Sequence, residues 1–329
     1  AYQIVAKDDL GNLLWDSEKV ASEQMHLVAW GADDLKSRTH VTWCVTVWDE
    51  KDEAETSENA WFEIGLLQKQ NWTAKWITGD YVPKKKERYP VDCFKKAFAI
   101  ASDKKVKKAR AYMSACGVYE GRINGEKIGK FILAPGITDY RKRVQYQTVD
   151  VTALLAAGDN ELSFMLGDGW YRGSVGAWGM KNYYGSETKL LAQLEITYED
   201  GSVDVIATDE RFDWTNDGPI RFADNKDGEI YDARMQDFLH AQWKKAKVTE
   251  HPVVPTASDN FILKEHEVFS NPKLITTPAG KTVLDFGQNI AGIVAFSVNA
   301  KAGQRLYLRM GELIKNGEFT QKNIQCVKK

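Results

Sequence analysis

The sequence predicts an all-β protein built from tandem β-sandwiches. Runs in which polar and apolar residues alternate recur along the chain, and a period of two is typical of strands with one buried face. Pairs such as Asn124-Gly125 and Asn316-Gly317 stand between these runs. They favour tight hairpins, because both residue types tolerate positive φ. Helical candidates are few and short. Many short strands separated by turn signals indicate sandwiches.

The length of 329 residues suggests more than one domain, and three regions can be distinguished. Residues 1–75 are expected to form a small sandwich, with Trp43 and Trp48 of one strand as core anchors. Residues 76–250 form a larger sandwich. Residues 251–329 begin a new β-domain, in which the run 292–299 is a partly alternating strand. We expect the chain to be truncated inside a larger protein.

Composition narrows the class of protein. The 44 basic and 46 acidic residues are well mixed and give a net charge of -2, so no nucleic-acid-binding face is expected. No apolar run reaches the roughly 20 residues that span a bilayer. No leader opens the chain, so we expect a cytoplasmic protein, or a periplasmic or secreted one whose leader was removed. Four cysteines lie far apart and predict neither a disulfide framework nor a zinc site; they are Cys44, Cys93, Cys116 and Cys326.

The most distinctive motif is the run Leu-Gly-Asp-Gly-Trp-Tyr-Arg-Gly at 166–173. Its three glycines suit a tight loop better than the interior of a helix or strand. Such a loop would present Trp170 and Tyr171 as flat apolar faces beside Asp168 and Arg172. Mixtures of this kind bind sugars, because C–H faces stack on rings while hydroxyls meet charged groups. The alternative is a structural turn in which Trp170 fills the core.

The run Gly-Glu-Ile-Tyr-Asp-Ala-Arg at 228–234 is the second candidate site. In an extended segment Asp232 and Arg234 share one face. They either grip a hydroxylated ligand together or pair with each other at a domain contact, and the residues leave both interpretations open.

No catalytic motif can be identified. The five histidines are scattered, and the chain has no H-E-x-x-H zinc spacing, no G-x-S-x-G serine elbow and no phosphate-binding glycine pattern. A glycosidase needs two opposed carboxylates. The 46 acidic residues offer too many pairs for a choice, so the sequence identifies no catalytic acid.

A series of short motifs in fixed order runs through almost the whole chain. They lie at 14–20, 42–49, 62–67 and 72–77, then at 117–120, 123–129, 133–136, 138–140, 144–146, 166–173 and 228–234, and finally at 285–289, Gly292 and 311–313. In order and spacing they resemble the N-terminal, non-catalytic region of bacterial α-L-rhamnosidases, glycoside hydrolase family 78. One departure is Ile137, which lies between the motifs at 133–136 and 138–140, where members of the family often carry Trp. Without that ring, this loop is less suited to stack on a sugar.

The resemblance implies a fold and a function. Residues 1–75 would be an immunoglobulin- or fibronectin III-like sandwich, 76–250 a jelly-roll-like sandwich and 251–329 the start of a further β-sandwich domain. In this family an (α/α)6 barrel further downstream removes terminal α-L-rhamnose by an inverting route, so no catalytic residue is expected here. The fragment would support that barrel and bind rhamnose-containing glycans or glycosides. The alternative is a purely structural scaffold without a ligand. Exposed edges of a partial sandwich would also favour homo-oligomers.

The resemblance also implies a site. Related second domains in some family members bind rhamnose with a calcium ion, and calcium takes several oxygen ligands from a loop. The acidic cluster is the candidate for calcium, with a hydrated surface turn as the alternative; it comprises Asp224, Asn225 and Asp227. The candidate sugar contacts are Asp168, Trp170, Tyr171, Glu229, Asp232 and Arg234. An exposed indole in a cleft would indicate a binding module, and a buried one a scaffold.

Overall fold

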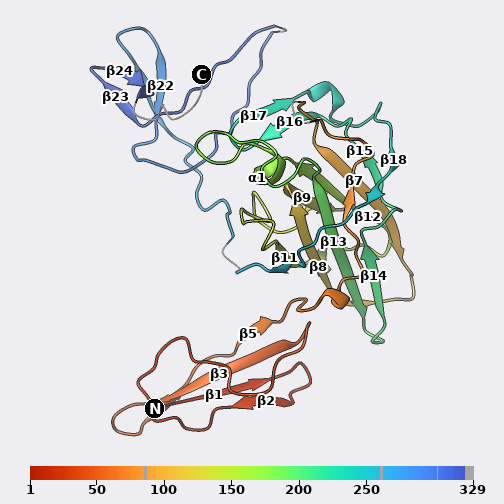
Figure 1. Cartoon of the computed structure of the whole chain (residues 1–329). Helices are drawn as coiled ribbons and strands as arrows, with labels where there is room; N and C mark the ends of the chain where they lie inside the picture. Colours follow the sequence, from red (N-terminus) through yellow and green to blue (C-terminus); the bar gives the residue numbers. More distant parts are fainter. Residues whose placement is uncertain (85–86, 260–261, 302, 323–329) are drawn as a thin grey trace. The chain divides into compact units, whose positions relative to one another are not determined.

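The computed structural model describes residues 1–84, 87–259, 262–301 and 303–322, and its regular secondary structure consists almost entirely of strands (Figure 1). The predicted all-β fold is thus confirmed. The chain divides into two compact units, Ala1–Lys264 and Glu265–Lys329. The sequence division at 250/251 differs from this boundary, because β20 (Thr256–Ala257) pairs in parallel with β11 (Gln145–Asp150) and keeps that segment in the first unit. In the described residues no helix is long and apolar enough to cross a membrane.

The first part of unit 1 is a five-stranded antiparallel sheet in the order β2-β1-β3-β4, with β5 also paired to β3. The strands are β1 (Tyr2–Lys7), β2 (Leu13–Asp16), β3 (His40–Trp48), β4 (Ala54–Thr56) and β5 (Ala60–Glu63). Trp43 and Trp48, the predicted core anchors, are only half-buried. They are an odd number of positions apart and so point to opposite faces of β3. Trp30 packs instead against Trp15, with ring centroids 5.1 Å apart.

The second part of unit 1 is a two-sheet sandwich. One sheet has the order β10-β9-β12-β7-β15-β18, and the other the order β19-β6-β13-β8-β11-β20 with β14 on β13. The strands of the first are β7 (Asp92–Ile100), β9 (Val118–Ile123), β10 (Glu126–Lys127), β12 (Gly158–Gly167), β15 (Asp213–Thr215) and β18 (Lys244–Lys245). Those of the second, besides β11 and β20, are β6 (Ile77–Thr78), β8 (Val106–Cys116), β13 (Lys189–Tyr198), β14 (Val203–Ala207) and β19 (Lys247–Val248). Alternate residues of these strands, such as Phe94, Phe164 and Leu194, fill the core between the sheets.

Local sequence explains the turns. Asn124 and Gly125 both adopt positive φ between β9 and β10, as predicted for a two-residue hairpin. The run 166–173 ends β12 and then forms one short helix, α1 (Gly169–Arg172), which the sequence did not predict. Gly169 makes this turn feasible, because its φ is +52° and a Cβ there would stand 2.5 Å from Cγ2 of Val118. The run 151–155 contains a single helical turn, a 3-10 helix at Thr152–Leu154.

The two parts of unit 1 are joined by polar contacts, one part-buried and one buried. The Arg38 guanidinium donates to Glu195 of β13 from Nε to Oε2 at 2.6 Å and from Nη2 to Oε1 at 2.5 Å. The Tyr146 hydroxyl accepts a hydrogen bond from the Leu66 N–H and donates to the Leu66 carbonyl at 3.1 Å. These bonds fix the end of the first part on the second sheet of the sandwich.

Unit 2 contains two hairpins in its described residues. One joins β21 (Lys273–Thr276) to β22 (Thr282–Asp285), and the other joins β23 (Leu313–Lys315) to β24 (Glu318–Thr320) through the predicted Asn316-Gly317 turn. The strand predicted at 292–299 is absent, because this segment finds no pairing partner among the described residues. Of the cysteines, Cys93 and Cys116 are buried free thiols and Cys44 is half-buried, while Cys326 lies outside the described residues.

Candidate functional site

A small pocket of about 70 Å³ lies where α1 meets the hairpin of β16 (Ile220–Asp224) and β17 (Gly228–Tyr231). Figure 1 shows α1 next to this hairpin, at one end of the sandwich. We call this space the α1 pocket. It is lined by Glu87, Arg88, Asp168, Arg172, Gly173, Lys181, Asn182, Phe222 and Asp224.

Arg172 is the central cation of the α1 pocket. Its side chain is only 4 % exposed, and its Nε donates to Oδ1 of Asp168 at 2.7 Å. The guanidinium also donates to the Tyr81 hydroxyl and lies over the ring of Tyr89, 5.3 Å from its centroid. Burial raises the pKa of the Asp168 carboxyl, and Arg172 opposes that shift. Burial would lower the pKa of Arg172, but the nearby acidic groups raise it above its usual value.

The fully buried carboxylate of Asp92 holds the residues that contact Arg172 in place. Its Oδ2 accepts hydrogen bonds from Oγ1 of Thr188 at 2.7 Å and from the Tyr81 hydroxyl at 3.1 Å. Its Oδ1 accepts from Nε1 of Trp214 at 3.0 Å. Burial raises the pKa of Asp92, and the charge of Arg172 acts against that rise. Because Tyr81 bridges Asp92 and Arg172, the guanidinium is held in one position beneath the pocket.

The acidic cluster assigned to calcium lies partly in this pocket, but its oxygens are already occupied. Oδ2 of Asp224 accepts from the Ser174 N–H at 2.7 Å, and Oδ1 accepts from the N–H groups of Lys226 and Asp227 at 2.8 Å each. The Asp227 carboxylate pairs with Lys181, which lowers its pKa, and Asn225 is exposed. A carboxylate surrounded by N–H donors does not fit calcium as it stands. Across the described ranges no group of three or more His, Cys, Asp or Glu is arranged to hold a metal.

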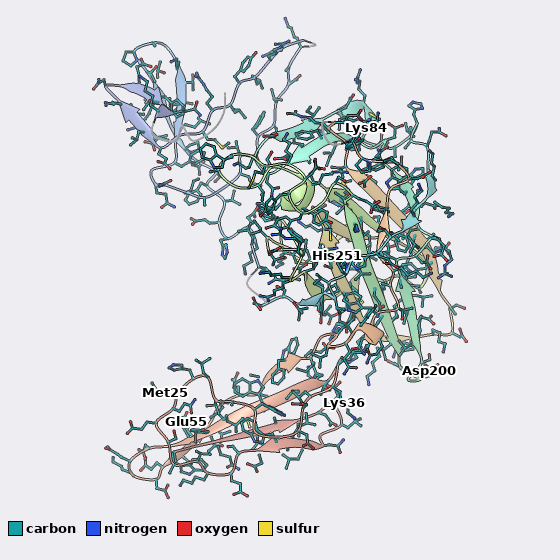
Figure 2. The ribbon with its side chains drawn as sticks, in the orientation of Figure 1. Met25, Lys36, Glu55, Lys84, Asp200 and His251 are labelled. Atoms are coloured by element: carbon teal, nitrogen blue, oxygen red, sulfur yellow. The ribbon has the colours of Figure 1, made fainter. Side chains whose placement is uncertain are left out.

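The aromatic candidates face the protein rather than the pocket. Tyr171 is 5 % exposed and packs edge-on against Tyr140, with ring centroids 5.3 Å apart, so the expected exposed ring is a buried one. Trp170 is partly buried against the same cluster. His251, labelled in Figure 2, completes this packing at 6.4 Å from the Tyr171 ring. The sequence analysis expected a loop that presents both rings on one side. In the short helix, successive residues point in different directions instead.

The remaining candidates lie outside the α1 pocket. Asp232 accepts from Nε and Nη2 of Arg234 at 2.8 and 2.6 Å, so the two residues pair with each other, as one of the two sequence interpretations held. This hydrogen bonding lowers the pKa of Asp232 to about 2. The Arg234 side chain is 88 % exposed, and Glu229 is an exposed residue of β17. Of the six candidate sugar contacts, the structure therefore brings only Asp168 to the pocket.

Several residues that line the α1 pocket or support it escaped the sequence analysis. Asp92 and Tyr81 carry no motif, since an isolated carboxylate or phenol is indistinguishable from the many others in the chain. Lys181 and Asn182 follow the recognised loop but lie beyond its last glycine. The signal that could have located the site was the pairing of Asp168 with Arg172, four positions apart within one motif.

Three family models match this succession of β-domains. The Rha78A-like N-terminal immunoglobulin domain matches residues 1–68, the α-L-rhamnosidase N-terminal domain matches 104–271, and the bacterial α-L-rhamnosidase concanavalin-like domain matches 275–329. The chain therefore belongs to the α-L-rhamnosidase family, glycoside hydrolase family 78, and corresponds to its N-terminal region. The resemblance noted from the sequence motifs is confirmed.

Relatives show how much of such proteins the chain represents. An α-L-rhamnosidase from Formosa agariphila is 34% identical over 98% of this chain, which spans 37% of that relative's length. The crystal structure of native α-L-rhamnosidase from Aspergillus terreus is 30% identical with a TM-score of 0.79, over 88% of this chain and 34% of that one. A Streptomyces avermitilis α-L-rhamnosidase crystallised with L-rhamnose shares the fold at 23% identity, with a TM-score of 0.77 over 88% of this chain and 45% of that one.

Proposed function

We propose that this chain is the non-catalytic N-terminal region of an α-L-rhamnosidase that hydrolyses terminal α-L-rhamnose from glycans or glycosides. The observation that carries the proposal is the match of three N-terminal family models, in order, over a chain that spans 37% of its Formosa relative. In this role the tandem β-domains support a catalytic barrel elsewhere in the protein. The two hydrogen bonds from the Arg38 guanidinium to the Glu195 carboxylate support a rigid scaffold.

The α1 pocket suits recognition better than acid–base catalysis. Asp168 is held by Arg172, and Asp224 is held by three backbone N–H groups, so neither carboxylate is free to move a proton to a leaving group. A volume of about 70 Å³ takes a few water-sized groups, which matches the hydroxyl edge of one sugar ring rather than a whole ring. We assign the polar edge of a rhamnose unit to this pocket, with Asp168 as its acceptor.

A scaffold without a ligand is the second candidate. It is favoured by the burial of Tyr171 and by the pairing of Asp232 with Arg234, which leave three of the six expected contacts unavailable. The two candidates differ in one measurable quantity, the heat released when L-rhamnose is added to the folded chain.

Calorimetric titration with L-rhamnose, with and without calcium, separates them. Lys181→Ala is the informative variant, because Lys181 lines the α1 pocket and is part-exposed. Lys105→Ala is the matched control, because its exposed ion pair with Glu199 lies elsewhere. Binding that weakens only in Lys181→Ala supports a sugar-binding region, whereas no heat at millimolar sugar leaves the scaffold. Calcium-dependent heat would show that the Asp224 cluster rearranges to bind the ion.

Hydrolysis tests the non-catalytic role directly. The chain alone is incubated with 4-nitrophenyl α-L-rhamnopyranoside, and we expect no release of nitrophenol. Turnover by the purified chain, retained after removal of contaminating enzymes, would refute the proposal that catalysis belongs to another part of the protein.

A further inference from the structure

A larger groove of about 310 Å³ lies on the outer face of the six-stranded sheet, away from the α1 pocket. Its floor comes from β7, β9 and β12, whose alternate residues face outward while the others fill the core. Ser163 pairs in register with Lys95 on one side and with Arg122 on the other, so these three side chains form one row across the sheet. We call this space the sheet groove. It shares no lining residue with the α1 pocket.

One wall of the sheet groove is aromatic. The segment between the 3-10 turn Ala233–Met235 and β18 carries Phe238 and Trp243, whose ring centroids lie 5.8 Å apart. Nζ of Lys95 lies 4.2 Å from the Trp243 ring centroid. A Cβ at Gly218 would stand 2.7 Å from the Phe238 ring, so this glycine lets the ring pack close to the connection between β15 and β16. The two rings thus pack against each other, and Phe238 also packs against Gly218.

The rest of the sheet groove is polar and partly unpaired. Glu120 accepts from Arg122 at 2.6 Å and lies 3.3 Å from Nζ of Lys127, so its charge is compensated. Glu161 and Asp237 have no ion-pair or side-chain hydrogen-bond partner in the described part of the chain. The lining holds two cations, Lys95 and Arg122, against three carboxylates, and its formal charge is therefore 2 − 3 = −1.

We propose that the sheet groove binds a neutral glycan chain, at a site separate from the α1 pocket. Free carboxylates accept hydrogen bonds from sugar hydroxyls, and the aromatic wall covers the C–H face of a ring. The volume of about 310 Å³ falls at the lower end of the range of small-molecule sites, roughly 300–1,000 Å³. Negative charge with two unpaired carboxylates disfavours sulfated or uronate-rich chains and nucleic acids. The choice of carbohydrate as ligand rests on the proposed function, while the groove itself does not.

The test compares three probes by calorimetry: α-linked rhamnotetraose, the same tetrasaccharide carrying sulfate groups, and L-rhamnose. We expect the wild-type chain to bind neutral rhamnotetraose. Glu161→Gln should weaken this binding about tenfold, because hydrogen bonds to a charged acceptor are strong ones. Trp243→Ala should weaken it at least as much. Asp159→Asn is the matched control, since it lies on the same face of β12 but outside the sheet groove and should bind as the wild type does.

Several outcomes would overturn the proposal. They are failure of the folded wild-type chain to bind rhamnotetraose at millimolar concentration, equal binding by Glu161→Gln and wild type, and tighter binding of the sulfated probe. Circular dichroism checks folding, and Glu161→Gln keeps the test valid if Trp243→Ala fails to fold. If Lys181→Ala abolishes tetrasaccharide binding while Glu161→Gln does not, the sheet-groove proposal fails and the α1 pocket stands. If the wild-type chain binds rhamnotetraose but not L-rhamnose, the result counts against the α1 pocket and supports the sheet groove.

Discussion

The contact between the first β-domain and the sandwich can be tested through one hydroxyl group. Tyr146 is 1 % exposed, and its hydroxyl serves both the N–H and the carbonyl of Leu66. Tyr146→Phe keeps the ring, which packs edge-on against Trp72 at 5.2 Å between centroids. The substitution therefore removes the hydrogen bonds and leaves the aromatic contact in place.

The expected cost follows from the two backbone groups that lose their partner. A buried donor or acceptor left without a hydrogen bond costs about 1–3 kcal/mol. Some relaxation will let water reach one of the two, so we expect the free energy of unfolding to fall by about 2–4 kcal/mol. Gly65 limits that relaxation, because even a Cβ at this position would stand 2.1 Å from the Tyr146 hydroxyl.

Urea unfolding followed by tryptophan fluorescence measures this loss, and limited proteolysis shows whether the first β-domain is released earlier. Tyr231→Phe is the control, because Tyr231 is half-exposed and should change stability by less than about 0.5 kcal/mol. If Tyr146→Phe costs no more than Tyr231→Phe, the hydroxyl does not hold the two parts together and the reasoning about a rigid scaffold is refuted.

Three further predictions concern α1 and the pair of Asp232 with Arg234. Gly169→Ala should lower the free energy of unfolding, measured in urea, by about 2–4 kcal/mol, and Gly201→Ala should lower it by about 1 kcal/mol. Both positions need positive φ, but only a Cβ at position 169 would clash with neighbouring atoms. Equal costs for the two variants would contradict this reasoning. Arg172→Met should cost about 3–5 kcal/mol, since it leaves a buried carboxylate without its cation, and thermal unfolding at pH 7 would show a loss this large. Asp232 has a folded pKa of about 2, below its unfolded value of about 3.9, so its pairing with Arg234 stabilises the fold above pH 4 and is lost as the pH falls through 2. Asp232→Asn should therefore flatten the acid limb of stability slightly, and salt should remove the difference, because the pair is exposed.

More of the fold than of the candidate site could be predicted from the sequence. Alternation of polar and apolar residues and the Asn-Gly turns correctly indicated an all-β chain, because both signals are local properties of the backbone. The run 292–299 shows the limit of that reasoning. Its composition suits a strand, but a strand also needs a hydrogen-bonding neighbour, and none is present among the described residues.

The α1 pocket depends on long-range contacts that no single motif contains. Asp168 and Asp224 lie far apart in the sequence, and Asp224 comes close because Gly173 has no side chain; a Cβ there would stand 2.6 Å from Oδ2 of Asp224. The sequence analysis singled out both carboxylates but assigned them to different tasks, one to sugar and one to calcium. Their shared position is decided by how the β16–β17 hairpin folds over α1, which periodicity cannot show.

Because Tyr171 is buried and the sheet groove is open, the two sites would contact different parts of a glycan. The glycine-rich motif uses its aromatic rings to fix α1 on the sandwich, whereas its charged residues Asp168 and Arg172 line the α1 pocket. A sugar face that needs an aromatic partner must find it elsewhere, and Phe238 with Trp243 are the rings that line an open groove beside unpaired carboxylates. Under the two proposals made above, stacking and polar recognition are separated: the sheet groove would hold a glycan chain, and the α1 pocket would contact the hydroxyls of one unit. If so, Lys181→Ala and Glu161→Gln should affect monosaccharide and tetrasaccharide binding independently, and a double variant should show additive losses.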